Sequence, residues 1–279
     1  MTVLLAFAAA LFLGVSDFLG GALSRRVPML TVLVLSQCVA VVAVVPRLIA
    51  EPIGAAPGGG FLWGAVSGIG AAVGVSALYR ALSIGTMGVV APIAALSVLV
   101  PVAAGLIAGD SLGPLLIVGM VVAVVGTVLA SGPEVRGDGR SHGVKPILLA
   151  LLAALGFGVN NLAVAWGSAY DVSATLLANV LTTLVLYLAA LAVVRRVPRA
   201  TGLPLLGIVG IGVLGFLANL FFAIASETGM LSVIAVCASV FPAVTVLLGW
   251  WLLKERLRLV QVVGVACVLG GVALVSLSI

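Results

Sequence analysis

The sequence predicts an all-α integral membrane protein of ten transmembrane helices, arranged as two five-helix repeats that are inverted relative to each other. Of its 279 residues, 63% are hydrophobic and 8% are charged, whereas soluble domains hold about 45–50% apolar and about 25% charged residues. Apolar runs of about 20 residues, the length that crosses the hydrocarbon core of a bilayer, recur along almost the whole chain. Short motifs of the first half also recur in the second.

Ten apolar runs are long enough to be membrane spans. A closed β-barrel is the alternative way to cross a bilayer, but its strands alternate apolar and polar residues. Runs such as VVAVVGTVLA (121–130) are apolar on every face and therefore favour helices. The predicted spans are residues 3–23, 28–49, 60–83, 87–108, 112–131, 146–168, 172–194, 203–225, 229–252 and 258–277.

The distribution of lysine and arginine between the spans predicts their orientation. The odd-numbered loops hold eleven of the thirteen basic residues, namely Arg25, Arg26, Arg136, Arg140, Lys145, Arg195, Arg196, Arg199, Lys254, Arg256 and Arg258. The even-numbered loops hold Arg47 alone, and Arg80 lies just inside the third span at its odd-loop end. Because cytoplasmic loops carry the excess of basic residues, both termini are expected outside the cytoplasm of a multi-pass protein of the inner (plasma) membrane.

Two pairs of matching segments indicate an internal repeat. LGVSDFL (13–19) aligns with FGVNNLA (157–163) at an offset of 144, and TMGVVAPIAALSV (86–98) aligns with TGMLSVIAVCASV (228–240) at an offset of 142. We therefore expect a first five-helix repeat over 1–132, a cytoplasmic linker over 133–145 and a second repeat over 146–279. Because five is odd, the second repeat enters the membrane in the opposite sense, a construction that recurs in secondary transporters.

The chain resembles the EamA-like transporters of the drug/metabolite transporter superfamily over essentially its full length. Besides the layout of two five-span halves, the resemblance rests on GVSDFLGG with its partner GVNN, on ALYRALSIGTMGVVAPIAAL (77–96) and on LLKERLRLVQVVGVACVLGGVAL (252–274). In the first half, the loop GDSLGPLLIVG (109–119) also keeps an acid, Asp110. The resemblance implies a ten-helix transporter of small solutes.

Asp17 is the acid that lies deepest within a predicted span, where an ionised side chain costs on the order of 2.5–3.5 kcal/mol. It lies about as deep from the odd-loop side as Arg80, so these two residues, with Tyr79, are candidates for a polar cluster on the transport path. The alternatives are that Arg80 only extends to the interface and that Asp17 only fixes helix packing.

The repeat alignment adds further candidates to the transport path. Ser16 and Asp17 align with Asn160 and Asn161, so the two pairs are candidate inner and outer constrictions. Three prolines interrupt corresponding spans and are candidate helix breaks near a central site, or else simple packing kinks. They are Pro92, Pro101 and Pro242. The intramembrane amides of Gln37, Asn179 and Asn219 either line the path or tie two helices together.

The sequence holds no constellation typical of an enzyme. Its one histidine, His142, lies in a polar loop, the three cysteines are scattered through apolar runs, and no nucleotide-binding motif is present. No cofactor, metal or nucleic-acid partner is expected. We therefore expect a secondary transporter that exports a small metabolite or drug-like solute by alternating access, with protons as a candidate coupling ion and a monomer or homodimer as its state. The rival interpretations are a non-transporting membrane scaffold and an intramembrane enzyme that modifies lipids.

Overall fold

The described part of the chain is built from helices alone. The computed structural model describes residues 2–24, 27–55, 57–84, 90, 93–94, 96–109, 113–131, 144–194, 200–238, 240–241, 243–245, 247–248 and 259–277. Over these ranges no β-strand occurs. This is the expected outcome for a chain in lipid, because a helix satisfies its backbone hydrogen bonds within one segment.

Six of the helices, counting α2 and α3 as one span, are long and apolar enough to cross a membrane. The first half holds α1 (Thr2–Ser24), α2 (Met29–Ala43), α3 (Val45–Ala50), α4 (Gly58–Ile84), the 3-10 turn η1 (Leu96–Val98), α6 (Leu99–Ile107) and α7 (Pro114–Ser131). The second half holds α8 (Val144–Ser168), α9 (Val172–Val194), α10 (Leu203–Thr228), α11 (Leu231–Ala238) and α13 (Leu259–Leu277). The six long spans are α1, α2 with α3, α4, α8, α9 and α10.

These helices begin and end within a few residues of the predicted spans wherever both ends are described. One difference is at Val44, where the second predicted span divides into α2 and α3. Pro46 explains the division, because its ring nitrogen has no hydrogen to donate to the preceding turn. The other is in the fourth predicted span, where Pro101 lies in the first turn of α6 and the 3-10 turn η1 precedes it.

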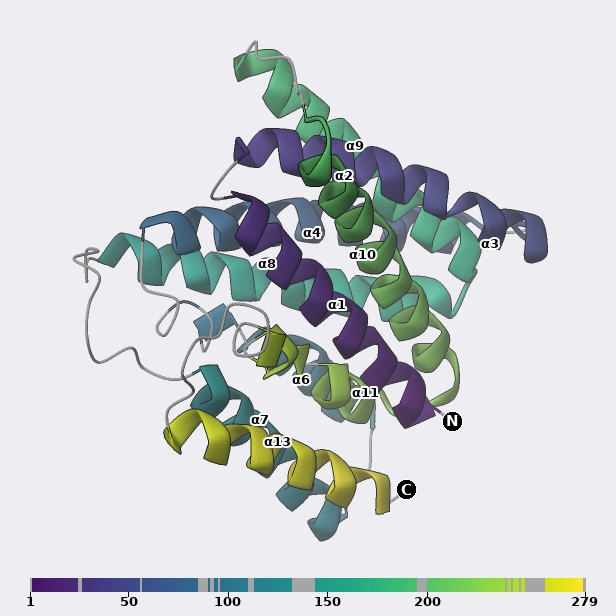
Figure 1. Cartoon of the computed structure of the whole chain (residues 1–279). Coiled ribbons are helices and arrows are strands. Elements are labelled where there is room, and N and C mark those ends of the chain that lie inside the picture. The colour runs from purple at the N-terminus through teal and green to yellow at the C-terminus, as the bar shows by residue number, and fades with distance from the viewer. Residues whose placement is uncertain are drawn as a thin grey trace.

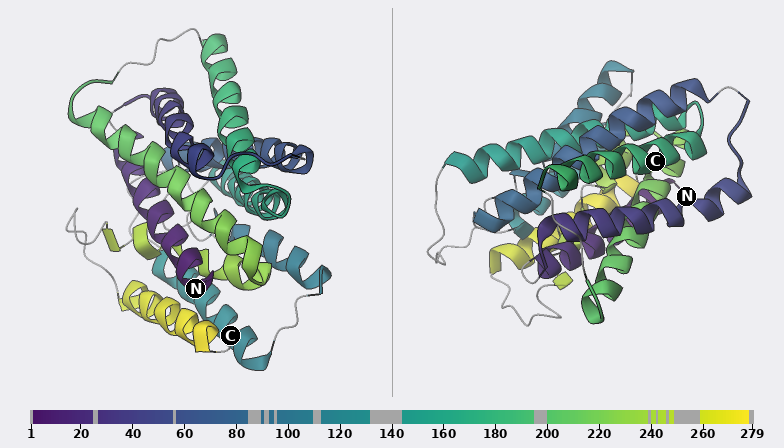
Figure 2. Two further views of the ribbon diagram at one scale, coloured as in Figure 1. Left: turned by 90° about the vertical axis from the view of Figure 1, so that its right-hand side faces the viewer. Right: turned by 90° about the horizontal axis from the view of Figure 1, so that it is seen from above.

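The packing pattern is nearly unchanged when the two halves are exchanged. α4 packs along α8 and α9, and α10 packs along α1 and α2. α6 contacts α11, and α7 contacts α13. The α7–α13 pair lies to one side of the other helices, and the first turn of α1 lies on the same side of the molecule as the last turn of α13 (Figures 1 and 2).

Glycines bring α4 close to its two neighbours. A Cβ atom added at Gly68 would lie 2.7 Å from the Asn179 carbonyl oxygen on α9, and one added at Gly70 would lie 2.7 Å from the Gly156 carbonyl oxygen on α8. Such close backbone contact is a general way of packing helices in lipid, where van der Waals contact replaces the hydrophobic effect.

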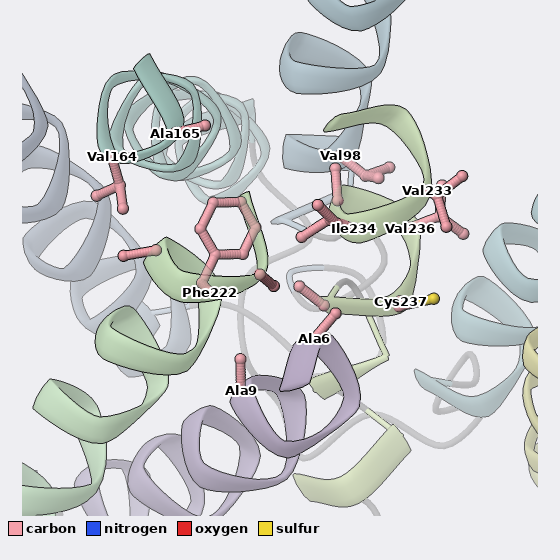
Figure 3. Packing of buried hydrophobic residues seen from close by; sticks show 14 of the residues in the cluster. Ala6, Ala9, Val98, Val164, Ala165, Phe222, Val233, Ile234, Val236 and Cys237 are labelled. Atoms are coloured by element: carbon pink, nitrogen blue, oxygen red, sulfur yellow. The ribbon is translucent and has the colours of Figure 1, made fainter. Parts of the chain in front are cut away.

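Small and branched side chains fill the space where α1, α8, α10 and α11 meet. Phe222 of α10 projects between these helices (Figure 3) and is almost fully buried. Ala6 and Ala9 of α1 present no bulk to it, so the ring fits without spreading the helices. Ala9 and Phe222 also line the cavity described below.

Candidate substrate cavity

A cavity of about 140 Å³ lies between the two halves. Residues of α1, α2, α4, η1, α8, α9, α10 and α11, together with Phe241, line it. No described residue of α7 or α13 does. Its polar or aromatic lining residues are Ser16, Asp17, Ser36, Gln37, Tyr79, Ser97, Phe157, Asn160, Asn161, Asn179, Thr183, Tyr187, Phe216, Asn219, Phe222 and Phe241.

The structure gathers most of the sequence-predicted site residues around this one cavity. Ser16 and Asp17 from α1, Tyr79 from α4, and Asn160 and Asn161 from α8 all line it. They come from both halves of the chain and from three different helices. The cavity is therefore the place in the described structure where these five candidate residues meet.

Arg80 is not brought to the cavity. Tyr79 is buried and lines it, whereas the next side chain, Arg80, is exposed and is not among the lining residues. The two diverge because successive residues of a helix point about 100° apart. Asp17 lines the cavity and Arg80 does not, so the structure does not bring these two residues together in the cavity wall.

The predicted helix breaks have separate outcomes. Pro101 is buried in α6 and does not line the cavity, but Ser97 and Val98 of the 3-10 turn before it do. The irregular backbone near Pro101 is thus part of the cavity wall. Pro92 and Pro242 lie outside the described residues.

Two tyrosines and Asp17 occupy the end of the cavity nearer the odd-numbered loops. Tyr79 lies within electrostatic reach of both Asp17 and Tyr187, and Tyr187 hydrogen-bonds Ser76. The Tyr79 hydroxyl also lies directly against Gly20. This contact brings together the C-terminal parts of α1 and α4.

An amide network occupies the other end of the cavity. The Asn179 Nδ2 group donates to Ser67 Oγ at 2.8 Å and to Asn160 Oδ1 at 3.1 Å. In turn, the Asn160 Nδ2 group donates to Asn161 Oδ1 at 3.1 Å and to Asn219 Oδ1 at 3.5 Å. Residues of α4, α8, α9 and α10 are thus joined through side chains that also face the cavity. Asn179 and Asn219 therefore both line the cavity and join neighbouring helices, so each fills the two roles considered for it from the sequence.

Comparison with known proteins decides the family. The sequence model of the EamA-like transporter family matches residues 1–132 and again residues 144–277. The chain belongs to the EamA-like transporter family. It is accordingly a multi-pass membrane protein of the drug/metabolite transporter superfamily.

A solved structure agrees with this membership at the level of the fold. A protein titled only "Crystal structure of protein" superposes with a TM-score of 0.81 at 20% sequence identity, over 99% of this chain and 96% of the other. Among the curated proteins, none matches this sequence.

Several lining residues of this EamA protein were not selected from the sequence. Thr183 and Tyr187 continue the α9 face that begins at Asn179, at intervals of four residues. This polar stripe was a usable signal, because residues four apart lie on one face of a helix. The lining phenylalanines gave no such signal, since they also suit a lipid-facing surface.

Over the described residues, no group of three or more His, Cys, Asp or Glu side chains is placed to hold a metal ion.

Proposed function

We propose that this EamA protein is a secondary transporter that exports a small metabolite or drug-like solute across the inner (plasma) membrane by alternating access. One observation carries the proposal: a cavity with an acid at one end and an amide network at the other lies between the two halves of the chain. Transporter sites typically lie at the interface of two repeats near the bilayer midplane. A scaffold would need no such polar cavity.

Matched contacts support the inverted repeat. A Cβ atom added at Gly14 would lie 2.6 Å from the Phe241 carbonyl oxygen, and one added at Gly158 would lie 3.0 Å from the Ser97 carbonyl oxygen. Both the glycines and the oxygens are separated by 144 positions. The same helix contact is therefore made twice, once from each half, which favours ten spans in two five-helix repeats, over 1–132 and 146–279, joined by a cytoplasmic linker.

Further contacts extend this correspondence. Gly68 of α4 packs on the carbonyl oxygen of Asn179 and the Cβ atom of Thr182. Gly212 of α10 packs on the carbonyl oxygen of Ser36 and the Cβ atom of Val39. The partners are again about 144 positions apart, and α4 and α10 are the third predicted spans of their halves. If the two halves rock against each other, they move along these glycine contacts.

The orientation of the chain follows from its loop charges, with both termini outside the cytoplasm. Ala55 and Lys145 are both exposed; Ala55 lies in an even-numbered loop, and Lys145 lies in the first turn of α8, next to an odd-numbered loop. In a background with Cys38, Cys237 and Cys267 replaced by alanine, Ala55→Cys should react with a membrane-impermeant maleimide added to intact cells. Lys145→Cys should react only after permeabilisation. The reverse pattern would overturn the orientation.

Transport is tested with the purified chain in proteoliposomes loaded with a mixture of metabolites. Release of a solute that empty liposomes retain supports a transporter, whereas a chain that moves none of them, yet remains folded, supports the scaffold. Hydrolysis or transfer on a lipid substrate would support the enzyme.

Asp17 is the candidate residue for coupling transport to protons. Asp17→Asn should abolish the pH dependence of transport. If this variant keeps the wild-type rate and the wild-type pH dependence, the coupling is overturned.

A further inference from the structure

Asp17 is the one charged side chain among the described residues that line the cavity. The described basic residues, Arg47, Arg80 and Lys145, contribute nothing to the lining, and Arg47 pairs with Glu51 instead. A negative charge in an apolar medium is costly unless it meets an opposite charge. The cavity wall therefore offers a carboxylate without a basic residue to compensate it.

Several hydrogen-bond donors of the lining are engaged within the protein. Seven lining side chains donate to protein acceptors: Ser16, Ser36, Gln37, Asn160, Asn179, Thr183 and Asn219. For example, Ser16 Oγ donates to the Ile211 carbonyl oxygen at 3.2 Å, and Thr183 Oγ1 donates to the Gly68 carbonyl oxygen at 3.0 Å. An anionic group needs free donors or a basic side chain. The described lining offers a solute only uncharged donors, together with acceptor oxygens, ring faces and one carboxylate.

Aromatic rings supply the second feature that suits a cation. Six line the cavity: Tyr79, Phe157, Tyr187, Phe216, Phe222 and Phe241. The face of such a ring attracts ammonium groups, and the attraction strengthens where water is excluded. The Tyr79 hydroxyl lies against Gly20, which is three residues after Asp17 on the same face of α1, so this ring stands on the side of the carboxylate.

We propose that the cavity selects a compact organic monocation, with its ammonium group beside Asp17 and its remaining apolar and neutral polar atoms among the phenylalanines and the amide network. This inference rests on the proposed function only in taking the cavity as the solute site. A carboxylate-bearing solute is disfavoured because its charge would face Asp17 with no described basic residue in the lining. A neutral solute of equal shape loses the attraction to the carboxylate.

Matched probes separate charge from shape. Choline and benzyltrimethylammonium are the cations, 3,3-dimethylbutan-1-ol is the neutral isostere of choline, glycine betaine is the zwitterion and 3,3-dimethylbutanoate is the anion. Ligand-observed NMR titration of the purified chain in nanodiscs, with empty nanodiscs as the blank, gives each Kd. At least one ammonium probe should bind about tenfold or more tightly than the neutral alcohol, and the anion should bind most weakly.

Variants test whether Asp17 is responsible. Asp17→Asn should reduce the preference for cations to less than about threefold, whereas Glu227→Gln, which removes an exposed acid outside the lining, should leave it unchanged. The double variant Asp17→Asn/Asn161→Asp moves the acid to the repeat-related position and should restore the preference. Restoration would show that the loss did not arise from misfolding.

The outcomes separate this inference from transport itself. The inference would be overturned if the alcohol bound as tightly as the ammonium probes, or if the anion or betaine bound more tightly than they do. It would also be overturned if neither ammonium probe bound. A chain that exports a neutral or anionic solute would also overturn it and would leave the proposed function intact. A chain that binds ammonium probes through Asp17 but moves no solute would support the inference and contradict the proposed function.

Discussion

The hydroxyl group of Tyr79 lies directly over Gly20, so that α1 and α4 meet at the point where the cavity begins. A Cβ atom at Gly20 would overlap this hydroxyl, and the ring carbon that bears it would be 2.7 Å away. Gly20→Ala should therefore displace Tyr79 and lower the free energy of unfolding by about 1–3 kcal/mol. Thermal unfolding in detergent measures the effect.

The neighbouring glycine provides the control for this variant. A Cβ atom at Gly21 would meet nothing within 4 Å, so Gly21→Ala should be neutral or stabilising by up to about 1 kcal/mol through helix propensity. Tyr79→Phe removes the overlapping oxygen and should recover part of the loss in Gly20→Ala. If the two alanine variants unfold at the same temperature, Tyr79 does not occupy the space above Gly20.

The two repeat-related glycines differ in how a substitution can be relieved. At Gly14 a Cβ atom would lie 2.6 Å from the backbone oxygen of Phe241, which cannot move aside by rotation. At Gly158 the backbone oxygen of Ser97 is farther away, at 3.0 Å, and the two shorter contacts are with the Cγ2 and Cβ atoms of Val100, at 2.5 and 2.7 Å. Val100→Ala should therefore rescue Gly158→Ala in part, whereas Val244→Ala should rescue Gly14→Ala much less, although both glycine variants lose about 1–3 kcal/mol.

Equal rescue at both sites, again measured by thermal unfolding, would contradict this difference. It would show that the Phe241 oxygen is not the limiting contact at Gly14. Gly21→Ala serves once more as the control, since it adds the same methyl group to the same helix as Gly14→Ala.

The hydrogen bond between Asn179 and Asn160 should appear as a coupling energy. Each single alanine variant leaves the other amide without its partner, so the double variant should cost less than the sum of the singles. We expect a coupling of about 0.6–1.7 kcal/mol, as for side-chain hydrogen bonds between other membrane helices. Asn219, which makes no hydrogen bond with Asn179 among the described contacts, provides the control pair with Asn179. A coupling as large in the control pair would argue against a direct bond.

The helices could be predicted from the sequence because each is a long apolar run, but their rotation about their own axes could not. Lipid and protein interior are both apolar, so a membrane helix lacks the polar face that orients a soluble one. Leu13 and Phe157 illustrate this, since both line the cavity yet read like any other apolar residue. Polar residues could be selected from the sequence: Asp17 because burying an acid in lipid is costly, and Asn160 and Asn161 because they align with Ser16 and Asp17 in the repeat.

Arg80 shows the limit of an argument from depth alone. It lies about as deep as Asp17, but depth fixes only the position along a helix and leaves the direction of the side chain open. Tyr79 rather than Arg80 faces the cavity, a difference of one residue that no charge or hydropathy pattern could decide. The repeat alignment was more informative, because it related whole contacts such as those of Gly14 and Gly158.

Asp171 joins two loops on the side of the even-numbered loops. Its Oδ1 atom accepts from the Ala174 amide at 2.7 Å, at the start of α9, and its Oδ2 atom accepts from the Gly54 amide at 2.8 Å. Asp171→Ala should lower the free energy of unfolding by about 0.5–2 kcal/mol through loss of the helix cap. It should also speed hydrogen exchange at Gly54, because this amide then loses its acceptor.

Two variants provide the controls. Asp171→Asn keeps one acceptor oxygen and should therefore show only one of the two effects. Glu227→Ala removes an exposed acid elsewhere and should show neither. Unchanged exchange at Gly54 in Asp171→Ala would mean that the aspartate caps α9 without holding the loop before α4, and the two loops would then be free to separate as the cavity opens to that side.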